Sequence, residues 1–365
     1  MDKDVIRIAV WSTGGIGSIA IHAIHERPNF ELVGVWVHNP EKVGKDAGEL
    51  AGGKPIGVRA TNDFDALVAL RPDAVFYAAS GPDRDKAAVR DYVRLLEAGI
   101  NVVTTTSTHM ISPDTYEPEF RDQIEAAANK GNATIHAGGI EPGFVADYLP
   151  VVLATQSKSI RKIHSYEIAL YDDYGVDFIM KEGMGFGMPM DFTSWMEAPG
   201  GIVSSWTGQI SLVAKAFGVK VEEIRSTFAK AASPRTFDVA FGTVEAGTCG
   251  AIRAQAIGIV DGKEAIIVEH ITRLAHDIAP DWPKGVGNLS YRVVIEGEPT
   301  IETVMEPVHS DPASVGIGWM SSGAGAMVST AMRALNAVPG VVAAKAGIAG
   351  SFDLPLPVPQ GIFRP

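Results

Sequence analysis

The sequence has a single cysteine, Cys249, among 365 residues. An intrachain disulfide is therefore excluded, and a reducing compartment is the natural setting for the chain. Cys249 lies in a Gly-Thr-Cys-Gly segment without an obvious activating neighbour. We therefore expect it to be a small core residue and not a nucleophile.

Basic residues are also scarce, because 31 Lys and Arg stand against 43 Asp and Glu, a formal net charge of −12. An acidic chain is a poor candidate for binding nucleic acid or an anionic membrane surface. We find no apolar run of the ~20 residues that a membrane span needs. The charged first residues do not follow a signal-peptide pattern. We expect a cytoplasmic protein with no nucleic-acid and no membrane partner.

Metal-ligand spacing is missing as well. His270, Arg273 and His276 come close together near one expected strand, but they match no ligand pattern of a zinc site. We expect no metal.

What the chain does have is a β-branched run, residues 5–11, that leads into a glycine-rich turn and then an amphipathic helix pattern over residues 16–24. Strand, glycine turn and helix are the context of a dinucleotide-binding fingerprint, here with Ser12 in place of the first glycine. The alternative is an ordinary tight turn. The residues expected to face a pyrophosphate are Ser12, Thr13, Gly14, Gly15, Ile16 and Gly17.

The end of the second expected strand, residues 31–37, bears on the choice of dinucleotide. An acidic residue usually binds the adenosine ribose about 20 positions after the glycine turn. Here His38 and Asn39 occupy that place, and Lys42 and Lys45 follow. The missing acid and the nearby bases favour NADP(H) over NAD(H), although Glu41 leaves NAD(H) open.

Strand and helix patterns alternate over residues 1–150, which predicts a Rossmann-type doubly wound parallel sheet, an α/β dinucleotide-binding domain. Its further strands are expected at 73–80, 101–106 and 134–137, and its helices at 84–98 and 114–131. Residues 151–320 predict an α+β substrate-binding and dimerisation domain with a mixed or antiparallel sheet. Its expected strands are 160–172, 236–244, 251–260, 265–274 and 291–296, and its expected helices are 206–217 and 221–231. Residues 321–365, a helix over 323–335 and a proline-rich tail, are expected to pack back on the first domain.

Five segments resemble one family: the turn at 12–17, residues 39–50, residues 138–144, residues 185–189 and residues 330–339. The chain is similar to the dihydrodipicolinate-reductase-like group that holds 2,4-diaminopentanoate dehydrogenase and the native amine dehydrogenases. The resemblance implies a homodimeric NAD(P)H-dependent oxidoreductase that transfers hydride to a C=N or C=O carbon. Its implied reaction is the reductive amination of a ketone or aldehyde with ammonia to give an amine.

The resemblance also implies places for the cofactor. It puts Ala79, Ser80 and Gly81 beside the adenosine and ribose. It puts the nicotinamide near Thr104, Thr105 and Thr106 and near the loop that contains Gly139.

In one place the chain departs from this family. Amine dehydrogenases carry a catalytic glutamate just after the fifth strand, where this chain has Ser107, Thr108 and His109. Glu141, where relatives usually carry asparagine, and His109 are the candidate replacements. Because neither Ser nor Thr stabilises an iminium well, two alternatives stay open: an ammonia-independent carbonyl reductase, and an inactive nucleotide-binding homologue.

The expected strand at 160–172 also carries polar groups. Strand alternation puts Tyr166 on one face and Glu167 and Tyr171 on the other. One of these tyrosines could donate a proton to substrate, although core packing is the more ordinary role. The loop at 178–195 is rich in Met and Phe, which suits either an adaptable apolar pocket or a buried contact.

Overall fold

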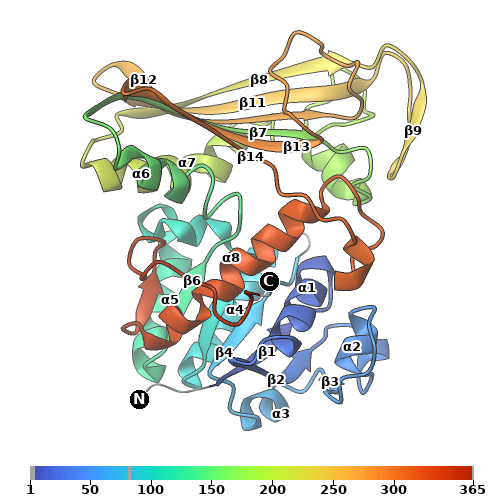
Figure 1. Cartoon of the computed structure of the whole chain (residues 1–365), viewed down its shortest axis with the longest axis vertical. Coiled ribbons are helices and arrows are strands. Elements are labelled where there is room, and N and C mark those ends of the chain that lie inside the picture. The colour runs from blue at the N-terminus through green and yellow to red at the C-terminus, as the bar shows by residue number, and fades with distance from the viewer. Residues whose placement is uncertain (1–4, 81–83, 364–365) are drawn as a thin grey trace. The chain divides into compact units, whose positions relative to one another are not determined.

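The computed structural model describes residues 5–80 and 84–363. The chain forms two compact units (Figure 1). The first unit comprises residues up to Gly143 together with Ser310–Gly318 and Met327–Pro365, and the second comprises Phe144–His309 and Trp319–Ala326.

The first unit is built on a seven-stranded sheet in which every pair of neighbouring strands is parallel. Its strand order is β15-β6-β5-β4-β1-β2-β3. The strands are β1 (Ile6–Trp11), β2 (Phe30–Trp36), β3 (Ala60–Thr61), β4 (Ala74–Tyr77), β5 (Asn101–Thr104), β6 (Thr134–Ala137) and β15 (Gly347–Ala349). The predicted doubly wound parallel sheet is confirmed. The added strand β15 was not predicted, because three residues show no period of their own.

Helices connect these strands. They are α1 (Gly15–His25), η1 (Pro40–Lys42), α2 (Ala47–Leu50), α3 (Phe64–Ala69), α4 (Arg84–Glu97), η2 (Thr108–Ile111), η3 (Pro113–Thr115), α5 (Pro118–Gly131) and η5 (Pro312–Val315). In α4, Ala88, Tyr92, Leu95 and Leu96 recur at helical spacing and are completely buried. This apolar stripe fixes the face with which α4 joins the core of the sheet.

Aromatic residues end three neighbouring strands. Trp11 stacks on Trp36 with ring centroids 4.1 Å apart, and on Tyr77 at 5.5 Å. Tyr92 of α4 meets Tyr77 edge to face at 4.9 Å. These rings lie directly before the loops that follow β1, β2 and β4, and they give those loops a rigid base.

Helix α8 (Ala324–Ala343) differs from its prediction, since it continues past residue 335 and contains Pro339. Burial overrides the helix-breaking tendency here, because Leu335, Val338 and Val341 are completely buried along one side. By length and composition, α8 is also the one helix within 5–80 and 84–363 that could cross a membrane, with a mean hydropathy of 1.2. The expectation that no apolar segment reaches that length is therefore wrong. In the first unit, α8 is a packed helix whose Asn336 Oδ1 accepts a 2.6 Å hydrogen bond from Arg27.

The second unit is built on a six-stranded sheet in the order β14-β13-β7-β12-β11-β8. Only β7 and β12 run parallel, so the predicted mixed sheet is confirmed. The strands are β7 (Ser159–Leu170), β8 (Glu223–Ala232), β11 (Cys249–Val260), β12 (Lys263–Arg273), β13 (Leu289–Glu298) and β14 (Ile301–Met305). Helices α6 (Tyr148–Ala154) and α7 (Gly201–Phe217) lie on the same face of this sheet (Figure 1).

Two predictions for the second unit are wrong. Residues 221–231 were expected to form a helix but form β8, which pairs with β11 along its whole length. Val221, Ile224 and Phe228 have the i, i+3, i+7 spacing of a helix face, and the pairing with β11 overrides this local pattern. The single strand expected at 236–244 is instead a hairpin of β9 (Phe237–Val239) and β10 (Gly242–Val244).

The Met- and Phe-rich segment is largely loop, with the short π-helical turn η4 (Ile179–Gly183) inside it. Met180, Met184 and Phe186 are buried in one apolar cluster of the second unit, together with Cys249. Burial raises the pKa of the Cys249 thiol to about 12. The geometry matches the expected role of Cys249 as a small core residue.

Candidate functional site

The loops that contain the predicted cofactor-binding residues share one edge of the parallel sheet. Because all strands run in one direction, their carboxyl ends meet there, which is where open α/β sheets bind ligands. Four backbone hydrogen bonds of 2.9–3.1 Å join each loop to the neighbouring strand: Ser12 N to Trp36 O, Ala78 N to Trp11 O, Thr105 N to Tyr77 O and Gly138 N to Thr104 O.

The glycine turn has the shape that a phosphate group needs. A Cβ on Gly17 would lie 2.1 Å from the carbonyl oxygen of Ser12, so this close approach requires glycine. A Cβ on Gly14 would meet nothing nearer than Ser12 Oγ at 3.9 Å. Gly14 is also the N-cap of α1, and no side chain caps this helix. Open space in front of an uncapped helix N-terminus fits a pyrophosphate.

Ser12 itself has a φ of +93°. The left-handed region is unfavourable for a residue with a Cβ and is natural for glycine, which the fingerprint has at this place. The backbone therefore follows the glycine fingerprint although the residue does not.

Lys42 brings a positive charge to the turn. Its Nζ donates a 2.9 Å hydrogen bond to Thr13 Oγ1. Asn39 accepts a hydrogen bond from Glu41 N and so caps η1, the short helix that contains Lys42. The predicted residues Thr13, Asn39 and Lys42 thus form one connected group. The fourth predicted residue of this region, His38, lies with its ring centroid 5.9 Å from that of Trp36.

The loops after β4 and β5 are joined to each other. Thr106 donates from Oγ1 to Ala79 O at 2.7 Å, and its backbone N donates to Thr104 Oγ1 at 3.0 Å. Ser80 is exposed beside them, and Thr105 is half-buried. Gly81, the remaining prediction for this loop, lies outside the described residues.

Ser107, Thr108 and His109, which follow β5, are placed differently from one another. Ser107 is fully buried, donates to Asp85 Oδ1 at 2.7 Å and lies 3.2 Å from the hydroxyl of Tyr92. Thr108 is the first residue of η2. The ring of His109 stacks near Tyr116 with centroids 6.4 Å apart. Ser107 is thus held in a buried polar network, whereas Thr108 and His109 are half-buried.

Glu141 lies in the tight loop after β6 and is half-buried. Two glycines shape this loop: a Cβ on Gly143, at φ +120°, would lie 2.5 Å from Gly139 N, and one on Gly139 would lie 3.0 Å from Thr330 Cγ2 of α8. Glu141 is the one carboxylate among residues 138–143.

In the second unit, Glu167 and His270 face each other across the parallel pair β7 and β12. His270 Nε2 lies 2.8 Å from Glu167 Oε1, which also accepts a 2.8 Å hydrogen bond from the hydroxyl of Tyr171. Burial raises the pKa of the Glu167 carboxyl, but the charge and hydrogen bond of His270, together with the hydrogen bonds of Tyr171 and Tyr291, hold this pKa below its ordinary value. A buried acid–base pair of this kind is typical of functional sites.

The sequence reasoning considered Glu167 only as a residue of a strand face, and considered His270 only as a possible metal ligand. Nothing local connects two residues 103 positions apart, and only the register of β7 against β12 brings them together. A group of three or more His, Cys, Asp or Glu side chains that could hold a metal ion does not occur in the described part of the chain.

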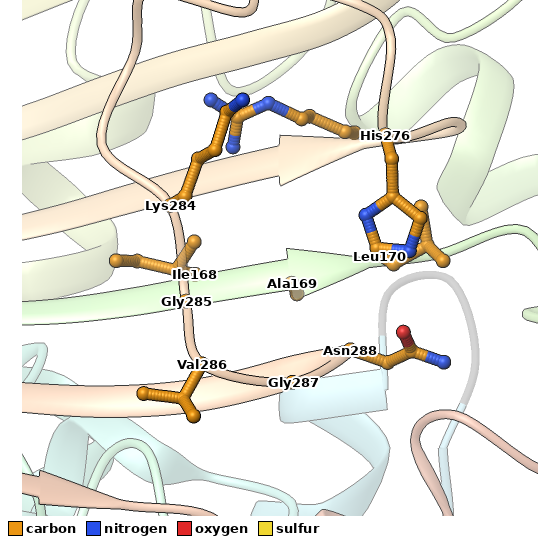
Figure 2. Close-up of a pocket in the computed structure, with 10 residues that line it drawn as sticks. Ile168, Ala169, Leu170, His276, Lys284, Gly285, Val286, Gly287 and Asn288 are labelled. Carbon is orange, nitrogen blue, oxygen red and sulfur yellow. The ribbon is translucent and has the colours of Figure 1, made fainter.

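A cavity of about 370 Å³ also lies in the second unit (Figure 2). Arg273 and Lys284 give it positive charge, and His276, the end of β7 and residues 285–288 complete its wall. The Arg273 guanidinium already donates to the carbonyl oxygens of Ile278, Ala279 and Trp282. Neither Glu167 nor His270 lines this cavity, so it is separate from the acid–base pair.

Comparison with known families matches the two parts of the chain separately. Residues 6–130 match the family of the dihydrodipicolinate reductase N-terminus. Residues 144–363 match the family described as the 2,4-diaminopentanoate dehydrogenase C-terminal domain.

Two curated proteins are similar over nearly the whole chain. An amine dehydrogenase from Streptomyces virginiae is 37% identical over 356 residues, which cover 96% of this chain and 97% of the relative. A 2,4-diaminopentanoate dehydrogenase from Acetoanaerobium sticklandii is 23% identical over 98% of this chain and 96% of its own length.

Two solved structures have the same fold. An amine dehydrogenase from Mycobacterium smegmatis superposes with a TM-score of 0.78 at 21% identity, covering 99% of both chains. A dipicolinate-bound dihydrodipicolinate reductase from a Paenisporosarcina species gives 0.51 at 12% identity, covering 96% of this chain and 98% of the other.

Proposed function

The chain belongs to the 2,4-diaminopentanoate dehydrogenase family of NAD(P)-dependent dehydrogenases, as the resemblance predicted, and from this premise we propose that it catalyses the reductive amination of a small, largely apolar ketone or aldehyde. Ammonia is the proposed nitrogen donor and the amine is the product. The proposal rests on membership of the family and on the glycine turn with its lysine. The reverse reaction would oxidise the amine.

The first unit is the proposed dinucleotide-binding domain, with NADP(H) preferred over NAD(H). The observation that carries this proposal is the open, uncapped turn at Gly14 with Lys42 hydrogen-bonded to Thr13. The backbone amides of residues 12–17 would hold the pyrophosphate, and Lys42 would pair with the 2′-phosphate. Ala79, Ser80, residues 104–106 and Gly139 would line the rest of the cofactor. When bound, the dinucleotide supplies the hydride.

Glu141 is the proposed acceptor of the proton that ammonium must lose before it can attack a carbonyl carbon. It is the carboxylate of the loop after β6, which lies next to β5 in the sheet. His109, in η2 after β5, is the second candidate for proton transfer, and Thr108 precedes it. A carboxylate has the further property of stabilising the positive charge of an iminium.

The alternative function is carbonyl reduction without ammonia. The observation that favours it is the absence of a carboxylate among Ser107, Thr108 and His109. The same observation would suit a homologue that binds the nucleotide without catalysis. We further propose that the protein is a cytoplasmic homodimer, which light scattering would test by giving twice the chain mass.

Two measurements test the proposed function. Thermal shift with NADP⁺ and with NAD⁺ should raise the melting temperature, more so with NADP⁺. Oxidation of NADPH by a panel of ketones should require ammonium. Turnover without ammonium would replace the proposal with carbonyl reduction, and absence of any thermal shift would refute the cofactor assignment.

Lys42→Gln tests the preference for NADP(H). Removing one charge-assisted contact at a half-exposed site should weaken NADPH binding about tenfold, or ~1.4 kcal/mol. NADH binding should change little, because NADH lacks the 2′-phosphate. Lys45→Gln, on an exposed neighbour, is the matched control. Equal weakening of both dinucleotides in Lys42→Gln would contradict the assignment.

A further inference from the structure

Positive charge without acid distinguishes the cavity of the second unit that Figure 2 shows. Arg273 and Lys284 both line it, whereas no acidic side chain is among the described residues of its wall. The whole chain has a formal net charge of −12, so a group of cations without an acid runs against its composition. A concave surface of this sign favours the binding of an anion.

Arg273, the last residue of β12, is a buried cation without a counter-charge. The residue is 5% exposed, and its Nε and Nη2 donate to three neutral backbone carbonyls, those of residues 278, 279 and 282. Among the described residues, no carboxylate lies within ion-pair distance of this guanidinium. Burial lowers the pKa of Arg273. A buried charge that lacks a counter-ion is costly, so an anion bound here would stabilise the second unit.

Other cations of the same sheet have a counter-charge of their own. Lys230 of β8 lies 2.7 Å from Glu197, and Arg253 of β11 lies 2.5 Å from Glu269. Both cations are half-buried, whereas Arg273 is buried. The cation that needs a counter-charge most therefore lacks one within the described chain, which is the pattern expected where the counter-ion is a ligand.

One guanidinium nitrogen of Arg273 is available to such a ligand. Nη1 donates to no acceptor in the part of the chain that the structure describes. It is also absent from the described polar atoms that are both buried and unpaired, so it is accessible. Because Arg273 lines the cavity, Nη1 can donate its two N–H groups to oxygen atoms of an anion there.

Two further donors reach the cavity from different segments. Lys284 belongs to the loop before β13, and His276 belongs to the loop after β12. Figure 2 shows their side chains on opposite sides of the cavity. Lys284 has no hydrogen bond or ion pair with any residue in 5–80 or 84–363. Its ammonium group is therefore free to pair with an anion between the two loops.

Two carboxylates of the same region are engaged elsewhere. Asp277 pairs with Arg235 at 3.2 Å. Glu306 accepts a 2.6 Å hydrogen bond from Ser290 Oγ and lines a neighbouring cavity instead of this one. Neither carboxylate takes the place of an anionic ligand, so the positive charge of the cavity remains.

We propose that this cavity binds a phosphate group, either as the inorganic ion or as a small phosphate monoester. A phosphate carries a charge of about −1.5 to −2 near neutral pH, which matches the two permanent cations. Its several oxygens can accept from Arg273, Lys284 and His276 at once, although these donors come from different directions. The volume of about 370 Å³ and the apolar side chains of Ile168 and Leu170 leave room for the short carbon chain of an ester.

This binding site goes beyond the proposed function. Alternation along β12 and β7 puts Arg273 and Ile168 on the face of the sheet opposite to His270 and Glu167. The cavity is built from residues of the second unit alone. Phosphate binding can therefore be measured without the dinucleotide and without turnover.

Isothermal titration of the full chain, free of dinucleotide, tests the proposal with two probes. Inorganic phosphate should bind at one site with a Kd of about 1 mM or lower, against a chloride control of equal ionic strength. Propyl phosphate distinguishes the two sources of the group. Tighter binding than that of inorganic phosphate indicates a monoester whose carbon chain contacts the apolar wall, and equal binding indicates the free ion.

Substitutions at exposed positions place the bound phosphate in this cavity. Lys284→Gln should weaken binding about fivefold, because it removes one cation from a solvent-exposed place. Asn288→Asp should weaken it about tenfold, because it adds a negative charge to the wall. Lys263→Gln, an exposed lysine at the other end of β12, is the matched control and should leave binding unchanged.

Arg273→Gln should abolish binding. Because this variant leaves three carbonyl oxygens without a donor, its melting temperature is measured first, and the two exposed positions decide the test independently. The Kd of NADPH should be the same in every folded variant.

Four results would overturn the proposal. They are the absence of binding heat with both probes, unchanged binding in Lys284→Gln and Asn288→Asp, an equal loss in Lys263→Gln, and loss of phosphate binding when NADPH is saturating. The last result would mean that the phosphates of the dinucleotide occupy the cavity. Failure of the proposed function is seen separately, as missing turnover of NADPH with ketone and ammonium.

Discussion

His136 is expected to make the first unit sensitive to acid. It lies in β6, directly before the loop that contains Glu141, and its Nδ1 lies 2.9 Å from Ala349 O of β15. Burial is the main cause that lowers its pKa to about 4; the Ala349 carbonyl opposes this shift, and the charge of Arg333 contributes to it. In the folded protein the His136 imidazole therefore stays neutral as the pH falls to about 4.

The sign and size of the effect follow from linkage. Above pH ~6.5 both the folded and the unfolded chain carry neutral His136, so stability does not depend on this group. As the pH falls from ~6.5 to 4, the unfolded chain binds a proton that the folded chain does not, and the free energy of unfolding decreases. Between pH 7.5 and pH 4.5 the expected loss from this group is about 2.5 kcal/mol.

Urea unfolding at these two pH values measures this loss. His136→Asn keeps a donor for the Ala349 carbonyl and removes the titration. Any change in stability that the substitution causes at both pH values cancels, because each protein is compared with itself at the two pH values. The pH-dependent loss should thus be about 2.5 kcal/mol smaller in the variant. His25→Asn, at an exposed position, controls for the loss of a histidine. The same pH dependence in His136→Asn and the unsubstituted protein would refute the reasoning.

Three further predictions concern the turn and the loop after β6. Gly17→Ala should lower the free energy of unfolding by ~1–3 kcal/mol, because its Cβ would meet Ser12 O at 2.1 Å. Gly14→Val should leave stability unchanged and weaken NADPH binding. Urea unfolding and fluorescence titration measure the two effects, and the opposite pattern would contradict the assignment. Ser12→Gly should stabilise the protein by ~1 kcal/mol by relieving the positive φ, and a lower melting temperature would show that no strain is relieved. Glu141→Gln should reduce amination ~100-fold or more at unchanged NADPH affinity, and unaltered turnover would remove Glu141 from the mechanism.

Much of the first unit could be predicted because the information is local. The alternation of apolar runs and helical patterns, together with the glycine turn, indicated the parallel sheet before any coordinates, and the sheet has that form. Gly17 illustrates why: the need for glycine arises from a residue only five positions away. Successive strand patterns without helices between them indicated the mixed sheet of the second unit, and that sheet is present.

The predictions that failed concern segments whose conformation is decided by distant partners. The apolar residues Val221, Ile224 and Phe228 have helical spacing, yet ten residues of β11 hold residues 223–232 as a strand. Pro339 signals a helix end, yet α8 continues because its apolar side is buried. The short strands β14 and β15 exist only through their pairing with β13 and β6.

The sequence by itself determined the fold class, the family and the place of the glycine turn, since each of these follows from the order of neighbouring residues. The tertiary structure alone decided which polar groups meet. Lys42 reaches Thr13 across the loop after β2, and Glu167 meets His270 because β7 and β12 pair in one register and not another. The physical reason is that a shift of one residue would turn His270 to the other face of the sheet, and no local pattern records that register.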